Sequence, residues 1–446
     1  MNILRILILL FITNAASAQI LEQIVIRNNQ KTKDWVIHRE LLFKIGDTLS
    51  FDNQQILQRC QENIFNTALF NNVTITDTSI NKMRTILIDV EERWYFWPYF
   101  ILEPADRNLA TYLRSEKWER INYGIMSTKH NFRGRNEDLS LKIRMGFRQQ
   151  LGIHYFIPHI SKRIDKIGLL FDISMFRQKT SFVDIIDFKY HFLEFNTYAF
   201  LENRFRMGAL FRPQHNIKHH IISSLHLYNS KGTTPETNLI LLGTKDPLSN
   251  WLIFDYIFEY NTLDYVLYPT RGILLTFSVS SATDFKSNNW QNANLNVNIN
   301  QPFLTHFTYS TSLFGEHFFN TPPPIGLRRT IGNNYYFRGY EDNVWNAQTV
   351  GGVRQQISWN FYRKRHFKIK QIQTKKFNKP FLALYATGFT DMGCITNISQ
   401  ITGNEFLISF GTGIDMISYY DLIFRFEAVL NNNRTTLFNV HIGKVF

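Results

Sequence analysis

The chain has 446 residues, a net charge of +13 at pH 7 and only two cysteines, Cys60 and Cys394. It contains 40 Phe, 20 Tyr and 8 Trp, yet its mean hydropathy is slightly negative. Two distant cysteines exclude a disulfide framework, and the basic residues are scattered rather than clustered, which argues against a nucleic-acid-binding protein. After the N-terminus there is no apolar run of about 18 residues, so we expect no transmembrane helix.

The first 18 residues have the pattern of a secretory signal peptide. Arg5 supplies a positive charge, residues 6–12 form an apolar core too short to span a bilayer, and residues 16–18 (Ala-Ser-Ala) form a cleavage site of small side chains. We therefore expect the mature chain to begin at Gln19. Export separates the chain from most nucleic acid, so we assign the positive charge to loops and polar faces, some of them near anionic lipid head groups.

Residues 19–93 mix helical and extended patterns and predict a small α+β domain of order β-α-α-β-β. The second predicted helix has Ser50 or Asp52 as its N-cap. In chain order the predicted elements are a strand over 20–27, helices over 32–42 and 50–70, and strands over 73–76 and 84–91.

From Trp94 onward, apolar and polar residues alternate with a period of two, which is the pattern of strands with one apolar and one polar face. Five asparagines alternate with apolar residues over 292–300, and such a polar row would be costly in a dry core but not in a wet lumen. Residues 94–446 therefore predict a membrane β-barrel of about 16 antiparallel strands. The count depends on residues 182–202, whose pattern is ambiguous.

The C-terminal residues 435–446 also alternate, and the chain ends on an aromatic residue. An apolar face that ends on an aromatic carboxy-terminal residue is typical of the closing strand of an outer-membrane barrel. The residues that we predict to form this C-terminal barrel signal are Phe438, Val440, Ile442 and Phe446.

The N-terminal domain resembles a POTRA domain, the polypeptide-transport-associated module, and only one such module is recognised. One departure from the family is Asn28-Asn29, where Gly-Asn is usual. The residues that carry the resemblance are Ile24-Val25-Ile26, Arg39-Glu40-Leu41, Ile45-Gly46-Asp47 and Leu69-Phe70-Asn71-Asn72-Val73.

Two motifs in the barrel resemble those of the outer-membrane assembly and secretion superfamily, which includes BamA/TamA/FhaC-like proteins and the bacterial surface antigen family. One is Phe337-Arg338-Gly339-Tyr340 in a long polar stretch, and the other is F-x-D-x-G at residues 389–393. A third match, D-x-x-x-x-P-x-x-G, covers residues 264–272. With the POTRA domain, the resemblance covers essentially the whole mature chain.

The resemblance implies that the first motif lies on a loop folded into the lumen, where Arg338 pairs with Asp391 on the barrel wall. Without the family, these residues favour a solvated arginine and a pore-lining carboxylate. The residues of the expected lumen-loop lock are Phe337, Arg338, Gly339, Tyr340, Phe389, Asp391 and Gly393.

The resemblance implies insertion, folding or secretion of polypeptides at the outer membrane of a Gram-negative bacterium. Client polypeptides would bind the periplasmic POTRA domain, the outer-membrane lipid would surround the barrel, and periplasmic or lipoprotein accessories would assist. We expect no enzyme, cofactor or nucleic-acid partner. His215, His219 and His220 lack a carboxylate or cysteine at ligand spacing, so we expect no metal site there.

A passive porin is the main alternative function. Its polar lumen would carry basic residues that permit anion conduction, although a porin needs no POTRA domain. An adhesive surface antigen would require long functional loops, for which residues 229–250 and 321–349 are the candidates. An energy-coupled receptor would require a plug domain before the barrel. The basic residues predicted to point into the lumen are Lys142, Arg144, Arg354 and Arg425.

Overall fold

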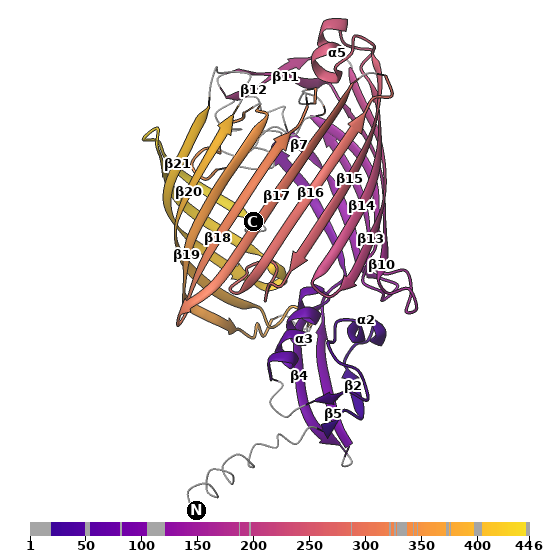
Figure 1. Ribbon diagram of the computed structural model, residues 1–446, viewed down its shortest axis with the longest axis vertical. Helices are drawn as coiled ribbons and strands as arrows, with labels where there is room; N and C mark the ends of the chain where they lie inside the picture. The colour runs from indigo at the N-terminus through magenta and orange to yellow at the C-terminus, as the bar shows by residue number, and fades with distance from the viewer. Residues whose placement is uncertain are drawn as a thin grey trace, which may run out of the picture. The chain divides into compact units, whose positions relative to one another are not determined.

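The computed structural model divides into two compact units, residues 1–93 and 94–446 (Figure 1). The expected signal peptide, the expected N-cap of the second helix and Phe446 lie outside the described residues. No helix within the described ranges is long and apolar enough to cross a membrane. The structure describes residues 19–49, 54–80, 83–104, 121–186, 188–195, 198–286, 288–320, 323–324, 327, 337–341, 343–345, 347–371, 374, 376–396 and 404–442.

The N-terminal unit is built on a three-stranded sheet in the order β2-β5-β4. Strand β2 runs parallel to β5, and β4 runs antiparallel to it. The elements are β1 (Gln19–Ile20), β2 (Gln23–Arg27), α2 (Asp34–His38), β3 (Thr48–Leu49), α3 (Gln54–Asn66), β4 (Phe70–Ile80) and β5 (Met83–Glu92).

The core of this unit lies between α3 and the sheet. Cys60 and Ile64 from α3 and Ile86 and Ile88 from β5 are fully buried. The amphipathic pattern of α3 thus faces the alternating apolar face of β5, and burial of these side chains stabilises the unit.

Four expected elements differ from the observed ones. The helix predicted over 50–70 ends at Asn66, and the strand predicted over 73–76 is the longer β4. The strand predicted over 20–27 is broken at Leu21, whose backbone bonds to Gly46 and Asp47, so β1 pairs with β3 and only β2 joins the main sheet. The helix predicted over 32–42 is only α2, because the backbone tightens to i−3 hydrogen bonds at Glu40 and Leu41.

The second unit is the predicted barrel, and its sheet contains 16 strands, each antiparallel to its neighbours. Strands β11 (Thr180–Ile186) and β12 (Lys189–Glu194) pair only with each other, which resolves the ambiguous segment without changing the count. The strands in sheet order are β6 (Phe96–Pro104), β7 (Ile121–Phe132), β8 (Glu137–Gly146), β9 (Arg148–Ile157), β10 (Ile167–Gln178), β13 (Phe200–Gln214), β14 (Ile217–Asn229), β15 (Leu248–Asn261), β16 (Gly272–Thr283), β17 (Asn289–Leu304), β18 (Phe307–Phe318), β19 (Thr349–His366), β20 (Phe381–Thr396), β21 (Glu405–Ser418), β22 (Ile423–Asn431) and β23 (Thr436–Ile442).

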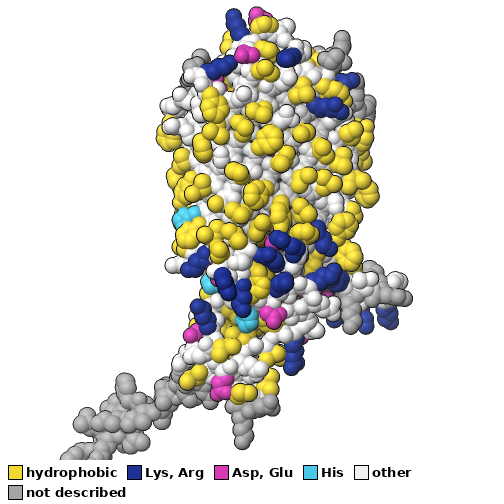
Figure 2. Space-filling view, turned by 90° about the vertical axis from the view of Figure 1, so that its right-hand side faces the viewer, with side chains coloured by type: hydrophobic (Ala, Val, Ile, Leu, Met, Phe, Trp, Pro, Cys, Tyr) yellow, Lys and Arg dark blue, Asp and Glu magenta, His cyan; other side chains and the backbone are white. Residues whose placement is uncertain are grey.

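The outer surface of the barrel is apolar. Alternate residues of each strand, such as Leu141 and Ile143 on β8 and Phe426 and Leu430 on β22, are large hydrophobic side chains that remain exposed. Hydrophobic side chains dominate the middle of the face seen in Figure 2, and Lys and Arg gather beyond it. This arrangement is the apolar band of a transmembrane β-barrel.

Two connections enter the lumen from opposite ends of the barrel. We call the end at which β6 begins the near end and the other the far end. The turn over 262–271 joins β15 to β16 at the near end, and the connection over 319–348 joins β18 to β19 at the far end, where the helix α5 (Pro235–Leu242) also lies (Figure 1). The carboxylate of Asp264 accepts hydrogen bonds from the backbone of Tyr265, Thr270 and Arg271 and so closes the near-end turn.

Candidate functional site inside the barrel

The centre of the candidate site is the contact between Arg338 and Asp391. Nη2 of Arg338 donates to Oδ1 of Asp391 at 2.6 Å, and Nε donates to Oδ2 at 3.0 Å. The backbone N–H of Arg338 donates to the same carboxylate at 3.2 Å. Both side chains are almost fully buried, so this is a bidentate, charge-assisted pair away from solvent.

The wall of the barrel supplies further contacts to Arg338 and to Asp391. Its Nη1 donates to Oε1 of Gln356 at 2.8 Å, and its guanidinium lies 3.6 Å from the ring centroid of Phe389. Arg354 is the cross-strand partner of Asp391 in the β19–β20 ladder, with its Nε 3.9 Å from Oδ2. The Asp391 carboxylate therefore lies between two guanidinium groups.

Phe337 packs against a part of the wall that lacks side chains. A Cβ at Gly393 would lie 2.0 Å from the Phe337 ring, and a Cβ at Gly352 would lie 2.7 Å from it. These two glycines are cross-strand partners, and the ring of Phe314 lies 5.3 Å from that of Phe337. The paired glycines thus leave the space in which the Phe337 ring is buried.

Gly339 and Tyr340 continue the segment toward the last strands of the sheet. Gly339 has φ of +85°, which favours glycine, and its carbonyl accepts a hydrogen bond from Nδ2 of Asn431 at 2.8 Å. The hydroxyl of Tyr340 donates to the carbonyl of Ile408 at 3.1 Å and also contacts Asn432. The Phe337–Tyr340 segment therefore contacts wall residues from β18 to the end of β22.

The charged contacts continue along the wall as one chain of alternating sign. Oε1 of Glu427 lies 3.7 Å from Nη1 of Arg338 and 3.5 Å from Nε of Arg425. Arg425 donates to Asp415 at 2.8 and 3.1 Å. The hydroxyl of Tyr268, from the near-end turn, donates to Oδ2 of Asp415 at 2.8 Å. Both lumen segments are thereby attached to one polar network.

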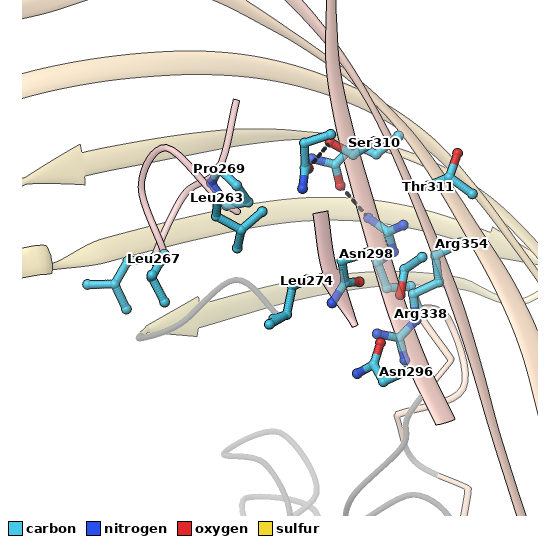
Figure 3. Close-up of a pocket in the computed structure, with 14 residues that line it drawn as sticks. Leu263, Leu267, Pro269, Leu274, Asn296, Asn298, Ser310, Thr311, Arg338 and Arg354 are labelled. Carbon is cyan, nitrogen blue, oxygen red and sulfur yellow. Dashed lines mark hydrogen bonds between the residues drawn. The ribbon is translucent and has the colours of Figure 1, made fainter. Parts of the chain in front are cut away.

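A cavity of about 200 Å³ lies between the two lumen segments. Figure 3 shows Leu263, Leu267 and Pro269 of the near-end turn on one side, with Arg338 and Arg354 on the other. Asparagines 296, 298 and 300 of the predicted polar row also line it. The cavity is thus amphipathic, with an apolar side, an amide side and two guanidinium groups.

The sheet has two ends, β6 and β23, and no ladder joins them within the described residues. The N–H of His130 donates to the carbonyl of Tyr95, in register with the β6–β7 ladder. Because hydrogen-bonded pairs alternate in an antiparallel ladder, the backbone nitrogen of Pro98 points away from β7, toward the free edge. The missing donor of proline therefore falls on the side that a closing strand would use.

The other expected site residues occupy the following positions. Phe438 and Val440 are exposed on the outer face of β23, and nothing is described for the Ile442 side chain. Nδ1 of His219 lies 2.9 Å from the hydroxyl of Tyr256, and this histidine belongs to no metal-ligand cluster of the described residues.

Sequence reasoning missed Gln356, Glu427 and Tyr268. Tyr268 lies within the D-x-x-x-x-P-x-x-G match, which by its resemblance indicates the entry to a strand and not a contact across the lumen. Glu427 lies on the predicted polar face of its strand, and that alternation was the available signal.

Residues 20–93 match the POTRA family model, described as "Surface antigen variable number repeat". Among curated proteins, none matches the chain. A solved structure of BamA from Haemophilus ducreyi lacking POTRA domains 1-3 is similar, with a TM-score of 0.50 and 12% identity over 95% of this chain and 84% of that chain. CdiB from Escherichia coli has a TM-score of 0.56 and 10% identity over 95% of this chain and 75% of that chain. At these identities the likeness shows the fold.

Proposed function

We propose that this chain, a POTRA domain followed by a 16-stranded outer-membrane β-barrel with the fold of BamA and CdiB, assembles or translocates polypeptides at the outer membrane of a Gram-negative bacterium. Its POTRA domain would lie in the periplasm and bind client polypeptides. Periplasmic or lipoprotein accessories are further candidate partners. The proposal assigns no enzymatic reaction to the chain.

The observation that carries this proposal is a POTRA domain on the same chain as a barrel whose lumen holds two anchored segments. A passive channel needs neither a periplasmic receiving domain nor a buried Arg338–Asp391 pair. The three-stranded sheet of the N-terminal unit has β2 and β4 as its outer strands. An extended client segment can add to such an edge through main-chain hydrogen bonds.

The two ends of the barrel sheet are the proposed exit for a client. Pro98 removes one donor from the free edge of β6, and Phe100 and Leu102 on this strand are strongly exposed. Fewer ladder hydrogen bonds between β6 and β23 would lower the free energy needed to part them. The seam would then open laterally, or the bilayer beside it would thin. Arg338 and Asp391 would act as a lock that holds the lumen segment during this step.

A small-solute channel is the alternative function, supported by the polar lumen wall and by Arg354 beside the cavity. Both functions can be tested on one preparation of the purified full-length chain in liposomes. We expect faster folding of urea-unfolded outer-membrane barrels, or uptake of a secreted polypeptide, relative to empty liposomes. Steady solute conductance without either activity would contradict the assembly proposal and favour the channel.

A further inference from the structure

Two carboxylates and one imidazole meet where the lumen segment reaches the last two strands. Glu341 follows the Phe337–Tyr340 segment, Glu427 lies on β22 and His441 lies on β23. One potential ligand atom of each lies within 4.8 Å of the other two. We propose that Glu341, Glu427 and His441 bind a divalent transition-metal cation, with Zn²⁺ the best match, and that this cation ties the lumen segment to β23.

The carboxylate oxygens are buried without sufficient hydrogen-bond donors. The side chain of Glu427 is 1% exposed, and in the described part of the chain neither of its oxygens accepts a hydrogen bond. Glu341 is also buried; its Oε2 accepts from the backbone of Gly339, whereas its Oε1 accepts no hydrogen bond from any described residue. Burial of a carboxylate is costly unless a cation or donors compensate it, so these oxygens point to a ligand.

The nearby arginines do not supply this compensation in full. Arg338 and Arg425 make their short contacts to Asp391 and Asp415, at 2.6 and 2.8 Å, and lie 3.5 Å or more from Glu427. Among the described residues, this network has three guanidinium groups for four carboxylates. The guanidinium groups are those of Arg338, Arg354 and Arg425, and the carboxylates are those of Asp391, Asp415, Glu427 and Glu341. A cation at the Glu341 end would offset the remaining negative charge.

The donor set selects the class of cation. Mg²⁺ and Ca²⁺ prefer oxygen ligands alone, whereas an imidazole with carboxylates suits Zn²⁺ and its neighbours in the first transition row. In a tetrahedral zinc site two ligands about 2.0–2.1 Å from the metal lie about 3.3 Å apart. Nε2 of His441 lies 3.5 Å from Oε2 of Glu427, close to that separation. Three protein ligands leave a fourth position for water or for a group of a bound polypeptide.

Such a cation would connect the lumen segment to β22 and β23, which form the last hairpin of the sheet. Strand β23 is one end of the sheet, and within the described residues it has a ladder only to β22. A metal bridge from Glu341 to His441 would therefore hold the lumen segment on the strand beside the free edge. Loading with the cation would stiffen this strand, and removal would loosen it.

The test uses the tag-free full-length chain in detergent, washed with a chelator and dialysed. Binding of Zn²⁺ is measured by calorimetry and as metal retained per folded chain, and Co²⁺ is added as a spectroscopic probe of imidazole and carboxylate ligation. We expect one ion per chain. The variants Glu341→Gln and His441→Gln should each weaken binding by about tenfold or more.

A matched control is His154→Gln. Nδ1 of His154 lies 3.5 Å from Asp172, the same separation as in the proposed site, but this pair belongs to no three-ligand cluster of the described residues. Its binding should equal that of the unmodified chain. His441→Gln is the decisive variant because its side chain is one-third exposed and the barrel should fold without it. Equal binding by all four proteins, or no retained ion in the folded unmodified chain, would overturn the proposal.

Discussion

The hydroxyl of Tyr268 donates a 2.8 Å hydrogen bond to the carboxylate of Asp415. Tyr268 lies on the turn between β15 and β16, whereas Asp415 lies on β21, which is a neighbour of neither strand in the sheet. Tyr268 is buried, and its ring lies 4.5 Å from that of Tyr385. The near-end turn is thus anchored on strands β20 to β22 by one polar contact and several apolar contacts. Asp415 in turn connects this anchor to Arg425.

We expect Tyr268→Phe to loosen the near-end turn. The substitution keeps the ring but removes a hydrogen bond to a charged acceptor, which contributes about 1.5–3 kcal/mol. The midpoint of urea unfolding should fall accordingly, and protease should cleave the turn faster. Tyr309→Phe, on an exposed tyrosine of β18, is the control and should change neither measurement. A stable Tyr268→Phe chain would show that the hydroxyl does not anchor the turn.

Arg338→Ala should release the lumen segment and impair activity. It leaves the buried Asp391 carboxylate without its bidentate partner, and removal of one member of a buried ion pair costs about 3–5 kcal/mol. Arg338→Lys should rescue only part of this loss, because lysine lacks the planar fork. Limited proteolysis between residues 319 and 348 measures the release, with the exposed Arg177→Ala as control. Unchanged cleavage and unchanged activity in Arg338→Ala would exclude a lock.

Gly393→Ala should displace the Phe337 ring. A Cβ there would lie 2.0 Å from the ring, so the segment must move, at a cost of about 1–3 kcal/mol. Gly388→Ala is a matched control on the same strand, because its Cβ would meet nothing within 4 Å. The fluorescence of Trp345, which packs in the same cluster as Phe337, and the unfolding midpoint report the change. Equal behaviour of the two alanine variants would contradict the tight contact.

The thiol of Cys60 should react slowly in the folded N-terminal unit. Burial raises its pKa above the ordinary value, with the Leu42 N–H donor opposing this effect, so the reactive thiolate is depleted at neutral pH. Maleimide labelling should therefore rise with pH and rise sharply on unfolding. Mass spectrometry can follow Cys60 and Cys394 separately. Rapid labelling of Cys60 in the folded chain at neutral pH would contradict its burial.

The barrel and the POTRA domain were predictable because their signals are local. Alternation over each strand defines an apolar and a polar face, and repetition over residues 94–446 made the pattern specific. The ends of elements were less predictable. The break at Leu21 arises from backbone hydrogen bonds to the remote Gly46 and Asp47, and α2 is shortened by local i−3 hydrogen bonds at Glu40 and Leu41 that no propensity signal marks.

The site was predictable only in part, because its contacts join residues far apart in the chain. The motifs around Arg338 and Asp391 were recognisable by family resemblance, and the structure places these residues in contact. Glu341, Glu427 and His441 have no common motif that would mark them as metal ligands. The histidines that the sequence offered for a metal were His215, His219 and His220, where no site was expected. The register of β22 with β23 and the path of the lumen segment bring these three residues together. Neither the register nor the path can be predicted from a local sequence pattern.

The central claim is that the chain assembles or translocates polypeptides, and depletion of the protein tests it most directly. The outer-membrane proteome should then be quantified, with re-expression of the unmodified chain and of the Arg338→Ala variant. We predict loss of a defined set of barrel or surface proteins, restored by the unmodified chain and restored less by the variant. An unchanged outer-membrane proteome, with altered solute uptake or without it, would contradict the claim.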